Sequence, residues 1–122
     1  MSQPLALIIE DDENLGRIFA LALKTYYQTE IIADGLEALQ RLPNLQPHLV
    51  VLDLNLPGAH GSQVLAFIRS QPALQQAIVI VTTAADRQAE AVADQADLTL
   101  IKPVSPAQLR ELAGRFRQNF TA

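Results

Sequence analysis

The residues that could carry out chemistry in this chain are three carboxylates, one hydroxyl and one ammonium group. Each of them ends or closely follows a short apolar run, and they are Glu10, Asp11, Asp53, Thr82 and Lys102. Crowded carboxylates repel one another unless one of them is protonated or a cation is present, and their oxygen atoms suit Mg²⁺. A metal ion beside a lysine and a hydroxyl would hold an anion with several oxygen atoms, and a phosphoryl group is the obvious one.

The carboxylates predict a Mg²⁺ site that keeps several water molecules. We expect Asp11 and Asp53 to bind the metal ion directly, because carboxylate oxygen atoms are hard ligands. The backbone carbonyl of Asn55, two residues past Asp53, would supply a further protein oxygen. Glu10 would act on the metal ion through a water molecule.

The remaining groups predict phosphoryl chemistry at one carboxylate. Asp53 can act as the nucleophile, since carboxylates form aspartyl-phosphates. In that mechanism Lys102 and the metal ion neutralise charge on the phosphoryl oxygens. The hydroxyl of Thr82 donates a hydrogen bond to one of these oxygens.

These residues need a scaffold that brings distant parts of the chain together, and the apolar pattern predicts one. Near-continuous apolar runs with many β-branched residues indicate strands buried on both faces. The predicted strands are Leu5–Ile9, Leu49–Asp53, Ala77–Val81 and Leu98–Ile101, with a weaker one at 29–33.

Helices are predicted between and after these strands. Apolar residues recur at helical spacing from Leu15 to Leu23, with Ile18 on the stripe, and again from Leu36 to Leu42. Ser62 is the expected cap of a third helix, residues 87–95 form a short and lightly anchored helix, and Ser105-Pro106 begins the last one.

Five strand–helix units imply an α/β fold with a single doubly wound parallel sheet covered by helices on both faces. Right-handed crossovers favour the flavodoxin-like strand order 2-1-3-4-5. In that order the first, third, fourth and fifth strands are successive neighbours, so the carboxyl ends that carry the five chemical groups meet at one edge of the sheet. Open α/β sheets bind their ligands at this edge.

Length and composition predict one domain over residues 1–122 and exclude several classes of partner. The net charge of −4 argues against direct binding to nucleic acid or to a membrane surface by this domain. No apolar run approaches the length of a membrane span, and no secretory signal begins the chain. The absence of cysteine suits a cytoplasmic protein.

The ordered set of motifs resembles the receiver domain of two-component response regulators, and the length is close to that of the stand-alone chemotaxis receiver. The matching features are Glu10-Asp11, Asp53 followed by Leu56-Pro57 and Gly61, Thr82, and Lys102-Pro103. This resemblance implies Mg²⁺-dependent acceptance of a phosphoryl group on Asp53 from a sensor histidine kinase or a phosphotransfer protein. It further implies slow hydrolysis, a downstream effector protein or domain, and a cis bond between Lys102 and Pro103, and it is compatible with a homodimer.

Several positions depart from the family pattern. Thr99 stands where the family usually has an aromatic residue, and Thr83 stands where Ala or Gly is usual. Leu98 replaces an Asp that helps many DNA-binding receivers to pair, and Gln95 replaces a common Gly. We therefore expect the phosphorylation chemistry to be retained, while the signal acts mainly through residues 83–95 rather than through the fifth strand and last helix.

Alternative functions remain to be separated. The departures at Thr99 and Leu98 suggest a second hypothesis, a receiver-like interaction module that works without phosphorylation, although such a module has no evident need for three crowded carboxylates.

A flavin phosphate would be repelled by Glu10, Asp11 and Asp12, and the chain contains no glycine-rich phosphate-binding motif. Phosphatases with an aspartyl nucleophile typically carry a DxD motif after the first strand. This chain differs from that pattern, because the residue two positions after Asp11 is Glu13. His48 and His60 have no partner at metal-ligand spacing.

Overall fold

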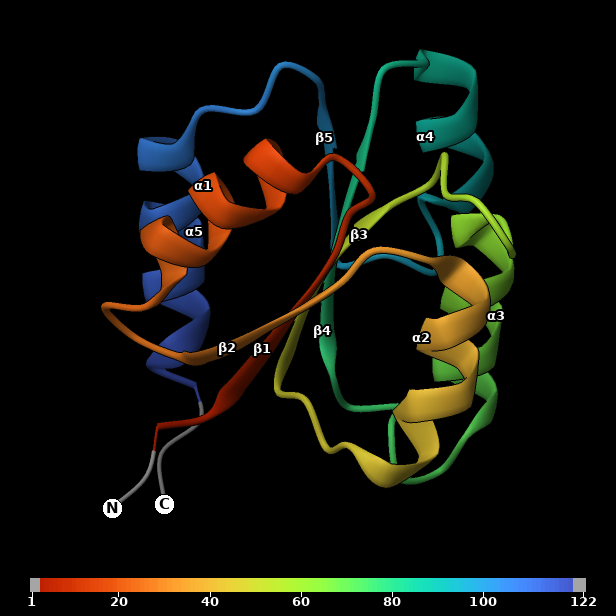
Figure 1. The fold of residues 1–122 in the computed structure, drawn as a ribbon, viewed down its shortest axis with the longest axis horizontal. Coiled ribbons are helices and arrows are strands. Elements are labelled where there is room, and N and C mark those ends of the chain that lie inside the picture. The colour runs from red at the N-terminus through yellow and green to blue at the C-terminus, as the bar shows by residue number, and fades with distance from the viewer. Residues whose placement is uncertain (1–2, 120–122) are drawn as a thin grey trace.

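The computed structural model describes residues 3–119, which form a five-stranded sheet with helices on both faces (Figure 1). All of the strand pairs are parallel, and the order is β2-β1-β3-β4-β5, as the apolar pattern predicts. The strands are β1 (Leu5–Ile9), β2 (Gln28–Ile32), β3 (Leu49–Asp53), β4 (Ile78–Thr83) and β5 (Leu98–Ile101).

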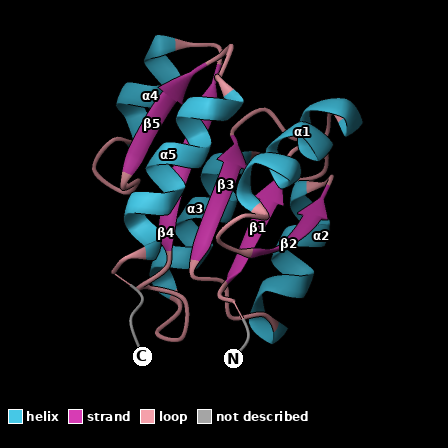
Figure 2. Ribbon diagram, turned by 90° about the vertical axis from the view of Figure 1, so that its left-hand side faces the viewer, coloured by secondary structure: helices cyan, strands magenta, loops and turns pink. Residues whose placement is uncertain are grey.

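The helices divide between the two faces of the sheet. Figures 1 and 2 show α1 and α5 on one face and α2, α3 and α4 on the other. The helices are α1 (Glu13–Leu23), α2 (Gly35–Arg41), the 3-10 helix η1 (Leu42–Asn44), α3 (Gly61–Ser70), α4 (Asp86–Val92) and α5 (Pro106–Arg117). The predicted fold class is therefore confirmed. Within the described residues, no helix combines the length and the apolar composition that crossing a bilayer requires.

The central strand separates two apolar cores. Val50 and Leu52 of β3 pack in the core under α2 and α3, whereas Leu49 and Val51 pack in the core under α1 and α5. Every residue of β3 is buried, because alternate side chains point to opposite faces and a helix layer covers each face. Burial on both faces explains why this strand is apolar up to its last residue, Asp53.

Two predictions about the helices are wrong in detail. Helix α3 begins at Gly61, and its cap is His60, whose ring nitrogen accepts from the backbone N–H of Ser62. Histidine and serine side chains can both accept such a hydrogen bond. Because the helix begins at Gly61, one residue before Ser62, Ser62 lies inside the helix and not at its cap position. Ile18 and Leu36 lie on the predicted apolar stripes but are 43% and 51% exposed. The buried side of α1 runs through Gly16, Phe19 and Leu23 instead, and that of α2 through Gly35 and Ala38.

Gly61 lies where α3 begins directly behind the end of β3. Its N–H donates to the carbonyl of Leu54 at 2.8 Å. A Cβ atom at this position would lie 2.4 Å from the backbone oxygen of Asp53 and 2.5 Å from the Cα of Leu54. Neither backbone atom can move without shifting the end of β3, so glycine is required for this close approach.

We expect Gly61→Ala to lower the free energy of unfolding by about 1–3 kcal/mol, the usual cost of forcing extra atoms into a packed site. Gly114→Ala is the matched control. The atoms nearest to its Cβ atom would be those of the Tyr26 ring, at 2.9 Å, and Tyr26 is 38% exposed, so its side chain can shift toward solvent more easily than backbone can. We expect its effect to stay below about 1 kcal/mol, because alanine is the better helix former. Urea titration of both variants measures the difference, and equal losses would contradict this account of Gly61.

Candidate functional site

The site lies at the carboxyl edge of the sheet, where four strands end side by side. Asp53 is the last residue of β3 and pairs in register with Thr82 of β4. Glu10 and Asp11 directly follow β1, and Lys102 directly follows β5, where its backbone N–H donates to the carbonyl of Thr83 at 2.8 Å. The strand order thus brings together residues that are up to 92 positions apart in the chain.

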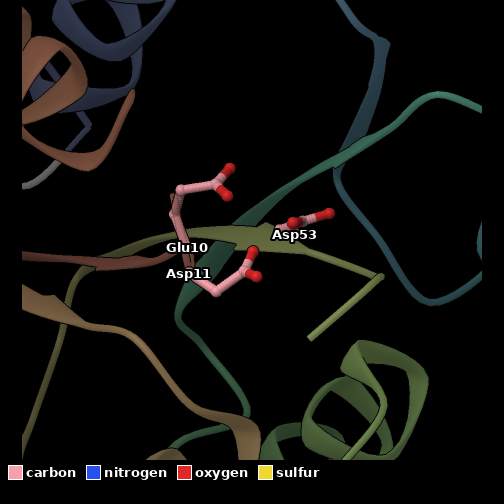
Figure 3. Close-up of side chains that lie close together, drawn as sticks. All are labelled: Glu10, Asp11 and Asp53. Carbon is pink, nitrogen blue, oxygen red and sulfur yellow. The ribbon is translucent and has the colours of Figure 1, made fainter. Parts of the chain in front are cut away.

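Three carboxylates gather at this edge (Figure 3). One oxygen atom from each of Glu10, Asp11 and Asp53 lies within 4.8 Å of the others. Glu10 is 2% exposed and Asp53 is 3% exposed, whereas Asp11 is open to solvent. Two buried acids so close together require compensating positive charge, because burial removes the water that would screen them.

Lys102 supplies part of that charge. Its ammonium group donates to Oε1 of Glu10 at 3.2 Å and lies 3.3 Å from Oδ2 of Asp53. Partial burial acts to lower the pKa of Lys102, but the two carboxylates outweigh it and the pKa is raised. Burial also raises the pKa of Glu10, and the charge of Asp53 adds to this effect, while the N–H of Asp12 and the ammonium group of Lys102 oppose it. The lysine is therefore held in its charged form between two acids.

The hydroxyl of Thr82 is a buried polar group without a hydrogen-bond partner among the described residues. Thr82 is only 1% exposed, so the bulk solvent hardly reaches it. The neighbouring hydroxyl of Thr83 differs, because it donates to Gln88 at 2.6 Å. A buried donor left unpaired beside Asp53 costs free energy, and such a group calls for a functional explanation.

The donor set fits a divalent cation that prefers oxygen ligands. Three carboxylates face a single ammonium group, so the cluster keeps excess negative charge. Asp11 is exposed and gives solvent access to the cluster, as a partly hydrated Mg²⁺ requires. Asn55 lies directly beside the carboxylate cluster, since its backbone N–H donates to Oδ1 of Asp53 at 3.1 Å.

The geometry of this edge agrees with the comparisons with known proteins. The response regulator receiver domain model matches residues 6–113. The chain belongs to the response regulator receiver domain family. The peptide bond between Lys102 and Pro103 is cis, as the resemblance implies.

Relatives and solved structures support the same family. The DNA-binding response regulator MtrA of Mycolicibacterium paratuberculosis is 30% identical over 115 residues, which are 93% of this chain and 51% of the relative. The receiver domain thus spans about half the length of the curated relatives it matches.

Two solved structures illustrate the likeness of the fold. The receiver domain of a LuxO repressor protein from Vibrio parahaemolyticus is 26% identical with a TM-score of 0.85, over 96% of this chain and 92% of that one. The Mn²⁺-bound form of response regulator Rcp1 is 29% identical with a TM-score of 0.76, over 94% and 92%.

One feature of this receiver domain escaped the sequence prediction. The side chain of Gln88 connects Thr83 at the end of β4 with Asn55 in the loop after β3. Gln88 is a polar residue in a short Ala-rich helix, which by itself suggests only a solvated side chain. Its two partners become neighbours only when the sheet has formed. His60, in contrast, is accounted for as the cap of α3.

The unpaired hydroxyl yields a prediction about stability. We expect Thr82→Val to raise the free energy of unfolding by about 1 kcal/mol, because it replaces an unsatisfied buried donor by a methyl group of the same shape. Thr83→Val is the matched control, one residue along the same strand. It removes a hydroxyl that makes hydrogen bonds, so we expect a loss of about 1–3 kcal/mol. Urea unfolding of the two variants checks the contrast, and a clear loss of stability in Thr82→Val would show that its hydroxyl has a partner in the native protein.

Proposed function

We propose that this receiver domain is a phosphorylation-dependent signalling switch whose Asp53 accepts a phosphoryl group in a Mg²⁺-dependent reaction. The observation that carries the proposal is the arrangement around this carboxylate. Lys102 lies 3.3 Å from it, and the unpaired hydroxyl of Thr82 stands next to it in register. A nucleophile, a cation and a free donor thus face one point at the edge of the sheet.

In the proposed reaction an oxygen atom of Asp53 attacks phosphorus. The new P–O bond forms as the P–N bond of a phosphohistidine breaks, and the imidazole nitrogen keeps the electron pair and takes up a proton from the solvent. The ammonium group of Lys102 then pairs with one phosphoryl oxygen, and the hydroxyl of Thr82 donates a hydrogen bond to another. Asp11, Asp53 and the carbonyl of Asn55 would hold a metal ion, with Glu10 acting through a water molecule, and the ion would supply positive charge against the carboxylates and the phosphoryl oxygens.

The reaction ends when water attacks the aspartyl-phosphate. Phosphate is released, and the carboxylate of Asp53 is restored. The domain is thereby modified and reset, and it acts on no outside substrate. A rearrangement of the hydrogen bonds around Thr82 is the signal that the rest of the domain transmits.

The relatives support the choice of ion and partners. A family member that is 29% identical binds Mn²⁺, which is another divalent cation that favours oxygen ligands. The MtrA relative is a DNA-binding regulator of about twice the length, so an effector protein or domain downstream of this receiver is a natural partner. The phosphoryl group would come from a sensor histidine kinase or a phosphotransfer protein in the cytoplasm. Pairing of two copies is compatible with the proposal.

The route of the signal is proposed to run through residues 83–95. Thr99 is partly buried in β5 and pairs with Val81, and its side chain has far less apolar area than an aromatic ring. Its movement would rearrange little surface. The loop after β4 and the short α4 directly follow Thr82, so they are the segments that its displacement reaches first.

We expect acetyl phosphate to add one phosphoryl group to the wild-type protein, and only when Mg²⁺ is present, because the cation must relieve the crowding of Asp11 and Asp53 before an anion can approach. Intact-mass measurement detects the added group. Asp53→Asn should stay unlabelled. Asp94→Asn makes the same change of charge at an exposed turn before β5, and it should be labelled like wild type.

Labelling of Asp53→Asn would contradict the proposal that Asp53 is the phosphoacceptor. Labelling of the wild-type protein in the presence of EDTA would contradict the proposed need for a metal ion. A wild-type protein that stays unlabelled with Mg²⁺ and acetyl phosphate but still binds its partner would instead favour an interaction module that works without phosphorylation.

The lifetime of the aspartyl-phosphate should depend on the residues beside the site. Ala84 is exposed one residue past β4, and it is too small to shield a phosphoryl group from water. We expect Ala84→Arg to change the rate of hydrolysis more than the rate of phosphorylation by acetyl phosphate. Ala93→Arg, at the exposed end of α4, is the control. Loss of label followed by intact mass gives both rates, and equal lifetimes in wild type and Ala84→Arg would contradict the expectation.

A further inference from the structure

Gln88, in the first turns of α4, uses both polar atoms of its side chain in hydrogen bonds to other elements. Its Oε1 accepts from the hydroxyl of Thr83 at 2.6 Å, and its Nε2 donates to Oδ1 of Asn55 at 3.0 Å. Asn55 in turn donates its backbone N–H to Asp53 at 3.1 Å. A continuous path of hydrogen bonds therefore runs from the side of α4 to the carboxylate that we propose as phosphoacceptor.

The start of α4 lacks the side-chain cap that the other α-helices of the described chain have, so it depends more on these hydrogen bonds. Those helices begin with a side-chain cap, supplied by Asp12, Asp34, His60 and Ser105. Helix α4 begins at Asp86, and the residue in its cap position is Ala85, whose methyl side chain cannot accept a hydrogen bond. Its first turn is held instead by Thr83, whose hydroxyl accepts from the N–H of Ala85 at 3.2 Å and donates to Gln88.

Little apolar contact compensates for the missing cap. Only Ala89 and Val92 are buried among the seven residues of α4. A short helix with a small buried face is marginal by itself, so the polar contacts of Gln88 carry a large share of its order.

We propose that Gln88 is a positioning residue for the phosphoacceptor site, an inference that rests on the proposed function of Asp53. In the unphosphorylated protein Gln88 holds the carboxamide of Asn55 against α4 and ties it to Thr83. This contact fixes the side chain of Asn55 at the mouth of the site and orders the helix with the same two hydrogen bonds. Coupling of this kind is reciprocal, so a change at either end alters the other.

The coupling has a direct path to the phosphoryl group. Thr83 is fully buried and adjacent to Thr82, whose hydroxyl turns to a phosphoryl oxygen in the proposed reaction. A shift of Thr82 therefore displaces the partner of Gln88. When Gln88 is released, Asn55 is free to turn toward the phosphoryl group, and the attack of water changes.

The first arm of the test uses hydrogen exchange of the unphosphorylated protein. Loss of both hydrogen bonds in Gln88→Ala should make the amides of residues 86–92 exchange about 5- to 30-fold faster, the factor that corresponds to one or two lost hydrogen bonds. Gln95→Ala makes the same substitution at an exposed residue after α4 and should exchange like wild type. Gln88→Glu should restore protection, because its carboxylate still accepts from Thr83 and also from the Asn55 amide once that group turns over.

The second arm measures the lifetime of the aspartyl-phosphate by loss of label. A role limited to anchoring α4 predicts equal lifetimes in Gln88→Ala and Gln95→Ala, whereas a positioning role predicts different ones. A double-mutant cycle with Thr83→Val checks the path, because effects that pass through one hydrogen bond are not additive.

The outcomes separate the inference from the proposed function. Unchanged exchange in Gln88→Ala, equal lifetimes in a protein that is labelled normally, or additive effects with Thr83→Val would each overturn the role of Gln88 and leave Asp53 as phosphoacceptor. Failure of the wild-type protein to be labelled at Asp53 would overturn both.

Discussion

The arrangement of the site depends on one electrostatic constraint, which is the burial of two carboxylates beside a single ammonium group. Glu10 and Asp53 are almost fully buried, and Lys102 contacts both of them. One cation between two acids, with Asp11 nearby, leaves negative charge uncompensated. Burial raises the pKa of Glu10, and the charge of Asp53 adds to this effect although Lys102 opposes it. A divalent cation would offset this excess negative charge, and the ammonium group of Lys102 could then engage a phosphoryl anion.

The fold meets this constraint through strand order and through one close backbone contact. Parallel pairing of β1, β3, β4 and β5 sets the ends of four strands side by side, and the register places Thr82 next to Asp53. Gly61 then lets α3 begin against the backbone of Asp53, which holds the carboxylate at the rim of the sheet. The scaffold thus maintains an arrangement of charges that burial alone would disfavour.

The sequence predicts the residues whose position follows from the strands, and it fails where position follows from tertiary contacts. Apolar runs define the strands, and the parallel order then implies that Glu10, Asp53 and Lys102 meet. Which side of a helix faces the sheet is less certain from periodicity, so Ile18 is exposed despite its place on the apolar stripe. The bridge made by Gln88 had no signal in the sequence, because Asn55 lies 33 residues away and becomes a neighbour only in the folded chain.

The central claim is that Asp53, Lys102 and Thr82 together receive a phosphoryl group, and a crystal structure with Mg²⁺ and beryllium trifluoride tests it most directly. The account predicts beryllium bound to a carboxylate oxygen of Asp53, with the ammonium group of Lys102 and the hydroxyl of Thr82 each at hydrogen-bond distance from a fluoride. The metal ion would lie on oxygen atoms of Asp11 and Asp53. A structure in which Asp53 stays unmodified, or in which Lys102 still bridges Glu10 and Asp53 while Thr82 remains unpaired, would contradict it.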